Sequence, residues 1–121
     1  MQYAILCYDS EQAVGAWSKE HDDAVMARLT AVQDKLEQQG RLGPVARLMP
    51  TRTAKTVRKQ MSTLVLDGPF AETKEQLLGF FVVECATHDE AVETARELGE
   101  ACGSTGAYEL RPLAFYRPGS L

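Results

Sequence analysis

Two segments of this chain are apolar on both faces of the strand that each is predicted to form. Every side chain from Tyr3 to Tyr8 is apolar or aromatic, and residues 77–86 contain the run Phe80–Val83. Successive side chains of a strand point to opposite faces of its sheet, so both faces of these strands need cover. At roughly 25 cal/mol per Å² of apolar area, a wet face would forgo several kcal/mol. The fold therefore needs a layer on each side of its sheet.

The predicted elements follow the order strand, helix, strand, hairpin, strand, helix, strand. We expect strands at residues 2–8, 41–49, 54–58, 62–66, 77–86 and 107–116, and helices that begin near Ser18 and Thr87 and end before Gly40 and Gly103. This order predicts an α+β fold of the ferredoxin-like type, βαββαβ, with an inserted β-hairpin. A length of 121 residues suits a single domain, residues 1–121.

Each predicted helix has one apolar stripe. The stripes consist of Val25, Leu29, Val32 and Leu36 in the first helix, and of Val92, Ala95, Leu98 and Cys102 in the second. Two such helices cover one face of the sheet, so the second face needs another occupant. We predict a homodimer in which two copies pack sheet to sheet about a two-fold axis, with a ligand cavity between helix and sheet or at the dimer seam.

Composition excludes several classes of partner. Thirteen Lys and Arg face seventeen Asp and Glu, with no basic run, so we expect no nucleic-acid binding. The apolar stretch Tyr3–Cys7 is too short for a membrane span or a secretory segment, so we expect a cytoplasmic protein without membrane contact. Cys7, Cys85 and Cys102 are widely spaced, which favours small buried side chains over a metal site or a disulfide framework.

The most distinctive segment is the loop of residues 66–75. Asp67 and Gly68 end a predicted strand, and Phe70 is expected to drop into the core and anchor the loop. In this reading Asp67 accepts a proton or holds a ligand hydroxyl, while Glu72 and Lys74 orient a polar ligand. In the alternative, Asp67 bonds its own backbone in an Asx turn, and the other two charges are solvated.

The string Asp67-Gly68-Pro69-Phe70, followed by residues 71–75, resembles the signature of the DGPF-domain proteins, a branch of the YCII-related family. Residues 109–112 extend the resemblance toward the end of the chain. It implies a ferredoxin-like unit that pairs into a dimeric α+β barrel. Some relatives in the wider superfamily act on small lactones, quinones or chlorinated aromatic breakdown products, and many DGPF proteins are associated with extracytoplasmic-function sigma factors.

Histidine-bearing branches of that family are thought to use a His on the first helix and an Asp after the second. At the corresponding places this chain has Leu29 and residues 101–104, which contain no acid. The resemblance therefore does not supply this pair of catalytic residues.

Other candidates come from the predicted helix and strand faces. His21 lies on the apolar side of its helix near Trp17, and either shuttles protons at a cavity or packs locally in the first turn. Tyr8 ends a strand, where cavities often open. Arg111 either binds an anionic ligand or, as we prefer, pairs with Glu109.

Two functions follow as hypotheses. The first is a cofactor-free enzyme that moves protons on a small enolisable or aromatic-derived metabolite, with Asp67 as acid/base, assisted by His21. Its substrate-binding residues are Tyr8, Phe70, Glu72, Lys74 and Arg111. The second is a ligand-binding or regulatory dimer module with a protein partner such as a sigma factor. The enzyme hypothesis requires Asp67 and His21 to approach one cavity.

Overall fold

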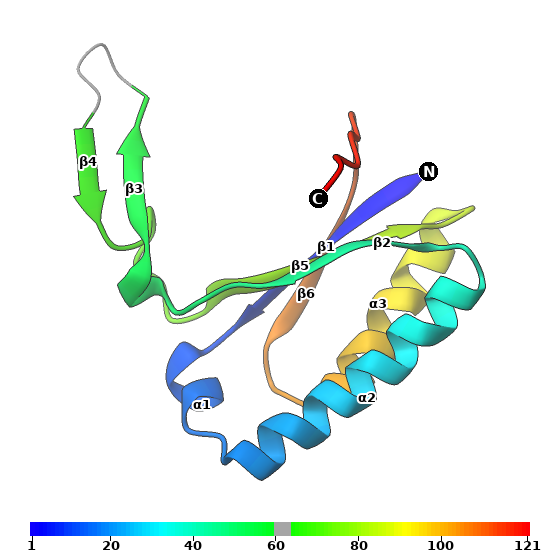
Figure 1. Cartoon of the computed structure of the whole chain (residues 1–121), viewed down its shortest axis with the longest axis horizontal. Helices are drawn as coiled ribbons and strands as arrows, with labels where there is room; N and C mark the ends of the chain where they lie inside the picture. The colour runs from blue at the N-terminus through cyan, green and yellow to red at the C-terminus, as the bar shows by residue number, and fades with distance from the viewer. Residues whose placement is uncertain (60–63) are drawn as a thin grey trace.

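A computed structural model describes residues 1–59 and 64–121 and shows a four-stranded sheet with two long helices on one face (Figure 1). The elements are β1 (Gln2–Asp9), α1 (Glu11–Gly15), α2 (Lys19–Gln38), β2 (Leu42–Arg47), the 3₁₀ turn η1 (Thr51–Thr53), β3 (Lys55–Arg58), β4 (Leu64–Asp67), β5 (Gln76–Glu84), α3 (His88–Cys102) and β6 (Ala107–Pro112). Within the described residues, no helix combines the length and the apolarity needed to cross a bilayer.

The sheet has the strand order β2-β5-β1-β6, and all neighbours are antiparallel. Strands β3 and β4 form a separate two-stranded sheet, inserted between β2 and β5. Without that insertion the elements read βαββαβ with the two crossover helices α2 and α3. The predicted ferredoxin-like α+β fold is therefore confirmed.

The core lies between the sheet and helices α2 and α3. Ile5 and Val83 point toward the helices and are fully buried, as is Leu98 of α3. The opposite side of the sheet, which we call the open face, carries Ala4, Leu6, Ala46 and Phe80, all half-buried. No helix covers the open face in the described residues (Figure 1). This agrees with the expectation that the two long helices cover only one face of the sheet.

The helix ends follow from local sequence. Ser18 Oγ accepts a hydrogen bond from the His21 backbone N–H at 3.0 Å, and Thr87 Oγ1 accepts one from the Glu90 N–H at the same distance. Gly40, two residues past the end of α2, has φ +69°, a conformation that other residues adopt only with strain. The predicted caps and stop are confirmed.

Some predicted boundaries shift. The buried residues of α3 are Ala91, Thr94, Ala95 and Leu98, so the buried stripe is rotated by about one residue, and Val92 and Cys102 border a cavity instead. Strand β6 ends at Pro112, not at residue 116, because it pairs with β1, whose first paired residue there is Tyr3. The hairpin is present. Its predicted turn at residues 59–61 and strand start at residue 62 fall mostly within residues 60–63, outside the described residues.

Irregular pairing marks the edge strand β2. The register against β5 shifts between Leu42 and Val45, the stretch that contains Pro44. Proline has no N–H to donate to a ladder, so it is tolerated at an edge or a bulge. β2 is an edge strand with such an irregularity, as predicted for residues 41–49.

Candidate functional site

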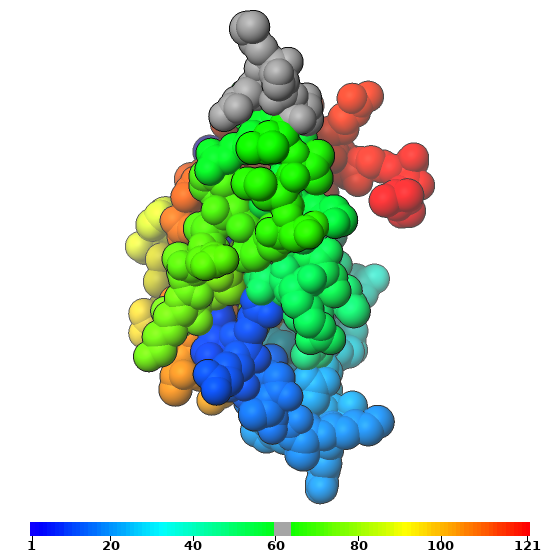
Figure 2. Space-filling model, turned by 90° about the vertical axis from the view of Figure 1, so that its left-hand side faces the viewer, coloured from blue at the N-terminus to red at the C-terminus, as the bar shows by residue number. Residues whose placement is uncertain are grey.

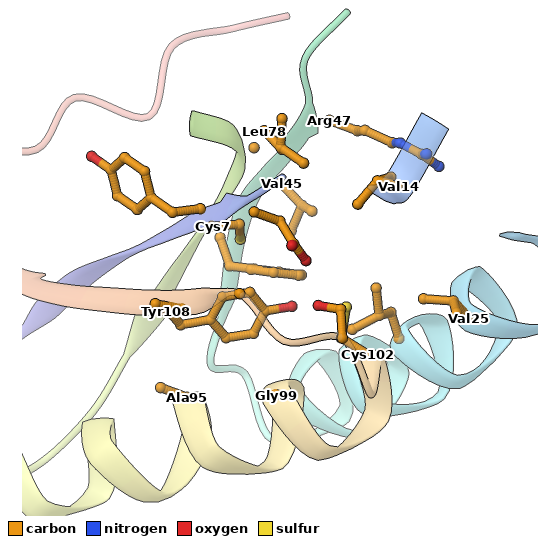
Figure 3. A pocket seen from close by; sticks show the side chains of 18 of the residues that line it. Cys7, Val14, Val25, Val45, Arg47, Leu78, Ala95, Gly99, Cys102 and Tyr108 are labelled. Atoms are coloured by element: carbon orange, nitrogen blue, oxygen red, sulfur yellow. The ribbon is translucent and has the colours of Figure 1, made fainter. Parts of the chain in front are cut away.

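A cavity of about 630 Å³ lies between the sheet and helices α2 and α3, near the end of β1 (Figure 3). Its walls are mostly apolar, with Val25 and Leu29 from α2, Ala95 from α3 and Phe81 from β5. Small-molecule sites in proteins usually measure about 300–1,000 Å³ and have apolar walls with a few polar groups. The cavity is therefore of a size and character that suit a small organic ligand.

Polar side chains from three elements gather at one part of the wall. Cys7 of β1 and Tyr108 of β6 are register partners in the sheet, and Tyr108 points toward Cys102 at the end of α3 (Figure 3). Ser104, just beyond α3, places its Oγ 3.4 Å from Cys102 Sγ. The pairing of β1 with β6 thus brings residues about one hundred positions apart to the same part of the cavity.

Asp9, the last residue of β1, adds a carboxyl group to this cavity wall. It is 8% exposed, and its Oδ1 accepts a hydrogen bond from the Ser10 backbone N–H at 2.8 Å. A Cβ at Gly106 would lie 2.7 Å from Asp9 Cγ and 2.1 Å from the Tyr8 carbonyl oxygen. Only glycine at position 106 lets the start of β6 approach the end of β1 this closely.

Burial keeps two of these polar groups protonated. It raises the pKa of the Cys7 thiol to about 12, and nearby Cys102 adds to the effect. Burial also raises the pKa of Tyr108, and the negative charges that Cys102, Cys7 and Asp9 can carry raise it further. At neutral pH the Cys7 thiol is thus a poor nucleophile, and the Tyr108 hydroxyl is available as a hydrogen-bond donor.

Arg47 brings positive charge to the rim of the cavity. Its guanidinium pairs with both carboxylate oxygens of Asp22 in the first turn of α2, at 2.9 and 3.3 Å. The hydrogen bond from Arg47 lowers the pKa of Asp22. Arg96 of α3 also lines the cavity. Arg96 Nε lies 3.7 Å from Glu93 Oε1, so a carboxylate balances each of these two guanidinium groups.

A family model described as the YCII-related domain matches residues 1–114, nearly the whole chain. The chain belongs to the YCII-related family. It is also similar to an uncharacterised protein of Rhizobium meliloti (strain 1021), with 58% identity over 122 residues that cover 100% of this chain and 98% of the relative. That relative's description names no activity. Family membership therefore agrees with the ferredoxin-like fold and assigns no reaction to this YCII-related protein.

Asp67 lies on β4 of the hairpin and does not line the cavity of this YCII-related protein. Its carboxylate pairs with Lys55 Nζ at 2.5 Å, and its side chain is 88% exposed. His21 is exposed as well, and its ring lies edge-on to Trp17 with the ring centroids 4.8 Å apart. Trp17 lines the cavity, but Asp67 and His21 do not. The structure therefore does not bring Asp67 and His21 together at the cavity.

The structure does not bring the predicted substrate-binding residues to one place. Tyr8 lines the cavity, whereas the side chains of Glu72 and Lys74 are exposed in the loop after β4. Arg111 Nε lies 3.2 Å from Glu109 Oε2, which is the predicted pair. Glu72, Lys74 and Arg111 do not line the cavity.

The expected burial of Phe70 in the core is wrong. Phe70 is 72% exposed. The guanidinium carbon of Arg58 lies over its ring, 4.9 Å from the ring centroid. The loop follows the hairpin away from the sheet, so the core is out of reach of this ring. A cation–π contact within the hairpin takes the place of core packing.

Sequence reasoning missed Asp9, Arg47 and Tyr108 of this YCII-related protein. Asp9 lies one residue beyond the predicted strand of residues 2–8, and Arg47 lies within the predicted strand of residues 41–49, so neither position indicates a cavity. Tyr108 follows Gly106 by two residues on a predicted strand, and its position gives no sign of a cavity. Gly106 was a usable signal, because a glycine just before a strand marks a close backbone approach.

Proposed function

We propose that this YCII-related protein binds a small, mostly apolar carbonyl compound in the cavity and moves a proton on it without a cofactor. Asp9 is the proposed acid/base, and Tyr108 donates a hydrogen bond to the carbonyl oxygen. The observation that carries this proposal is the buried Asp9 carboxyl in the same cavity wall as the protonated Tyr108 hydroxyl.

The proposed step is enolisation. The Asp9 carboxylate takes a proton from the carbon beside the carbonyl, and negative charge moves onto the carbonyl oxygen. The Tyr108 hydroxyl stabilises that charge by its hydrogen bond, and Asp9 returns the proton to the same or a neighbouring carbon. Apolar walls strengthen both interactions, because they lower the local dielectric constant.

Asp9 is a better base for a ligand in this cavity than Asp67. Asp67 is exposed and paired with Lys55, whereas Asp9 is buried beside Tyr108. The assignment of Asp67 and His21 as the catalytic pair, with Phe70, Glu72, Lys74 and Arg111 around them, stays a prediction. Tyr8 belongs to the proposed site in either case, since it lines the cavity.

Hydrogen–deuterium exchange tests the enzyme proposal. Small enolisable ketones, lactones and aromatic carbonyl compounds are incubated with the protein in D₂O, and proton NMR follows loss of the signal beside the carbonyl. We expect accelerated exchange for part of this panel, and a loss of about 10²-fold or more in Asp9→Asn. Asp34→Asn, an exposed change of the same kind on α2, is the matched control. Full activity in Asp9→Asn would contradict the proposal.

The second candidate is a ligand-binding or regulatory module. Leu29 supports it, because this apolar side chain lines the cavity at the position where the resemblance places the histidine of histidine-bearing relatives. Compounds of the same panel would then raise the melting temperature without exchanging protons. A sigma factor of the extracytoplasmic-function type is the protein partner that the resemblance suggests, and affinity capture from the source cell tests it.

We further infer membership of the DGPF branch, on residues 67–75, and a cytoplasmic location. We also propose a homodimer in which two open faces pack together. The half-buried apolar side chains Leu6 and Phe80 support this arrangement, because an isologous contact would remove both copies of that face from water.

A further inference from the structure

The hairpin strands β3 and β4 with their flanking residues, 54–59 and 64–68, which we call the arm, stand apart from the body of the protein. Strand β3 pairs only with β4 among the described strands, and no described residue of the arm belongs to the hydrophobic core. A two-stranded hairpin by itself is at best marginally stable in water. In the described chain, the arm therefore lacks the packing that such a hairpin needs.

Both faces of the arm are apolar. Val57 and Val65 are register partners on one face. Leu64 and Leu66 lie on the other face, where Phe70 packs beside Arg58. These five side chains are 43–72% exposed, and the larger of the two patches, formed by Leu64, Leu66 and Phe70, presents on the order of 300 Å² of surface. Contiguous apolar patches of this size are often functional.

The charge of the arm differs in sign from that of the rest of the chain. The arm carries three basic side chains and one acidic side chain, whereas the remaining residues carry ten basic and sixteen acidic ones. A basic arm on an acidic body is complementary to the body of another copy of the same chain. Electrostatic complementarity of this kind favours association with a second copy.

The arm rises on the same side as the open face, away from α2 and α3 (Figure 1). In a view from that side the described residues of the arm, in green, lie above α1, in blue (Figure 2). Its four-residue strands span about 13 Å at roughly 3.3 Å per residue, whereas packed sheets lie about 10 Å apart. A second copy on the open face would therefore lie within reach of the arm.

We propose that the arm docks on a second copy of this chain and clamps the sheet-to-sheet dimer. Two-fold symmetry places one arm against the flank of each partner. Stable interfaces bury roughly 800 Å² per partner, and the arm adds apolar area to what the open face alone would bury. This docking rests on the homodimer proposed above and does not depend on the chemistry of the cavity.

Removal of the arm tests the proposal directly. The Gly68 N–H donates to the Ala54 carbonyl oxygen at 2.8 Å, so an Asn-Gly turn can replace residues 55–67 between them. Sedimentation velocity over a wide concentration range should show a dimer for the wild type and at least about tenfold weaker dimerisation for the deletion variant. Equal dissociation constants would overturn the docking of the arm. A monomeric wild type would overturn both the docking and the homodimer.

Charged substitutions decide the question if the deletion variant does not fold. Val57→Asp with Val65→Asp places two carboxylates on one exposed face of the arm and removes no core contact. We expect the same weakening of the dimer with an unchanged circular dichroism spectrum. Ala27→Asp, at an exposed position of α2 on the far side of the sheet, is the matched control and should leave the dimer intact. An intact dimer in the double variant would contradict the proposal.

Discussion

Arg47 Nη2 lies 2.9 Å from Asp22 Oδ1, and this ion pair joins the end of β2 to the first turn of α2. Arg47 lines the main cavity and also a second cavity of about 440 Å³ beside α1, where Glu11 contributes a buried carboxylate oxygen without a hydrogen-bond partner among the described residues. The pair therefore ties the sheet to α2 beside both cavities.

Asp22→Asn should lower the free energy of unfolding by at most about 1 kcal/mol at neutral pH, because the ion pair is partly exposed. The lowered pKa of Asp22 means that its stabilising effect is full above the ordinary carboxyl pKa of 3.8 and is lost as the pH falls through the folded value. Urea unfolding at neutral pH and below pH 3.8 should therefore show a difference that shrinks in acid. A difference that grows in acid would contradict the assignment.

Cys7 should react slowly with thiol reagents in the folded protein. A pKa of about 12 in place of 9.0 lowers its thiolate fraction about a thousandfold near pH 8. Alkylation with iodoacetamide, mapped by mass spectrometry, should be at least about a hundredfold slower at Cys7 in buffer than in urea. Equal rates in buffer and urea would show that the thiol is not held in its buried, protonated form.

The same pKa predicts a loss of stability at alkaline pH. The unfolded thiol releases its proton above pH 9.0, whereas the folded thiol keeps it until about pH 12, so the free energy of unfolding falls as the pH rises through this range. Cys7→Ser should have a shallower alkaline slope than the wild type. Parallel slopes in urea titrations would contradict this prediction.

Gly106→Ala should destabilise the fold by about 2 kcal/mol or more. Its Cβ would lie 2.1 Å from the Tyr8 carbonyl oxygen, and a backbone atom cannot move aside without disturbing the pairing of β1 with β6. Gly99→Ala in α3 is the matched control. A Cβ there meets nothing within 4 Å, and alanine favours the helix by up to about 1 kcal/mol. Thermal unfolding of both variants measures the two opposite effects.

Asp67→Asn separates the two assignments of the acid/base. If Asp9 is the base, the proton-exchange rate stays within about twofold of the wild type. The free energy of unfolding then changes by less than about 1 kcal/mol, because the lost pair with Lys55 is exposed. A large fall in rate without unfolding would return the role to Asp67 on the arm.

The periodicity of the sequence predicted most of the fold. Ser18, Thr87 and Gly40 mark helix ends through contacts with residues a few positions away, so their effect is visible in the chain itself. The two-sided apolar strands likewise predicted that one helix layer would not cover the sheet. The exposure of Phe70 was not predictable in this way, because it depends on the direction in which the arm leaves the sheet.

The amino-acid sequence by itself determined the elements, their order and the ferredoxin-like arrangement, because burial along one helix or strand repeats with the local backbone period. The tertiary structure alone decided which polar groups share the cavity. Asp9, Tyr108 and Cys102 come from two paired strands and a helix end, and only the register that places Cys7 opposite Tyr108 brings them together. It also decided that the arm stands free, since a hairpin's own sequence does not fix what it packs against.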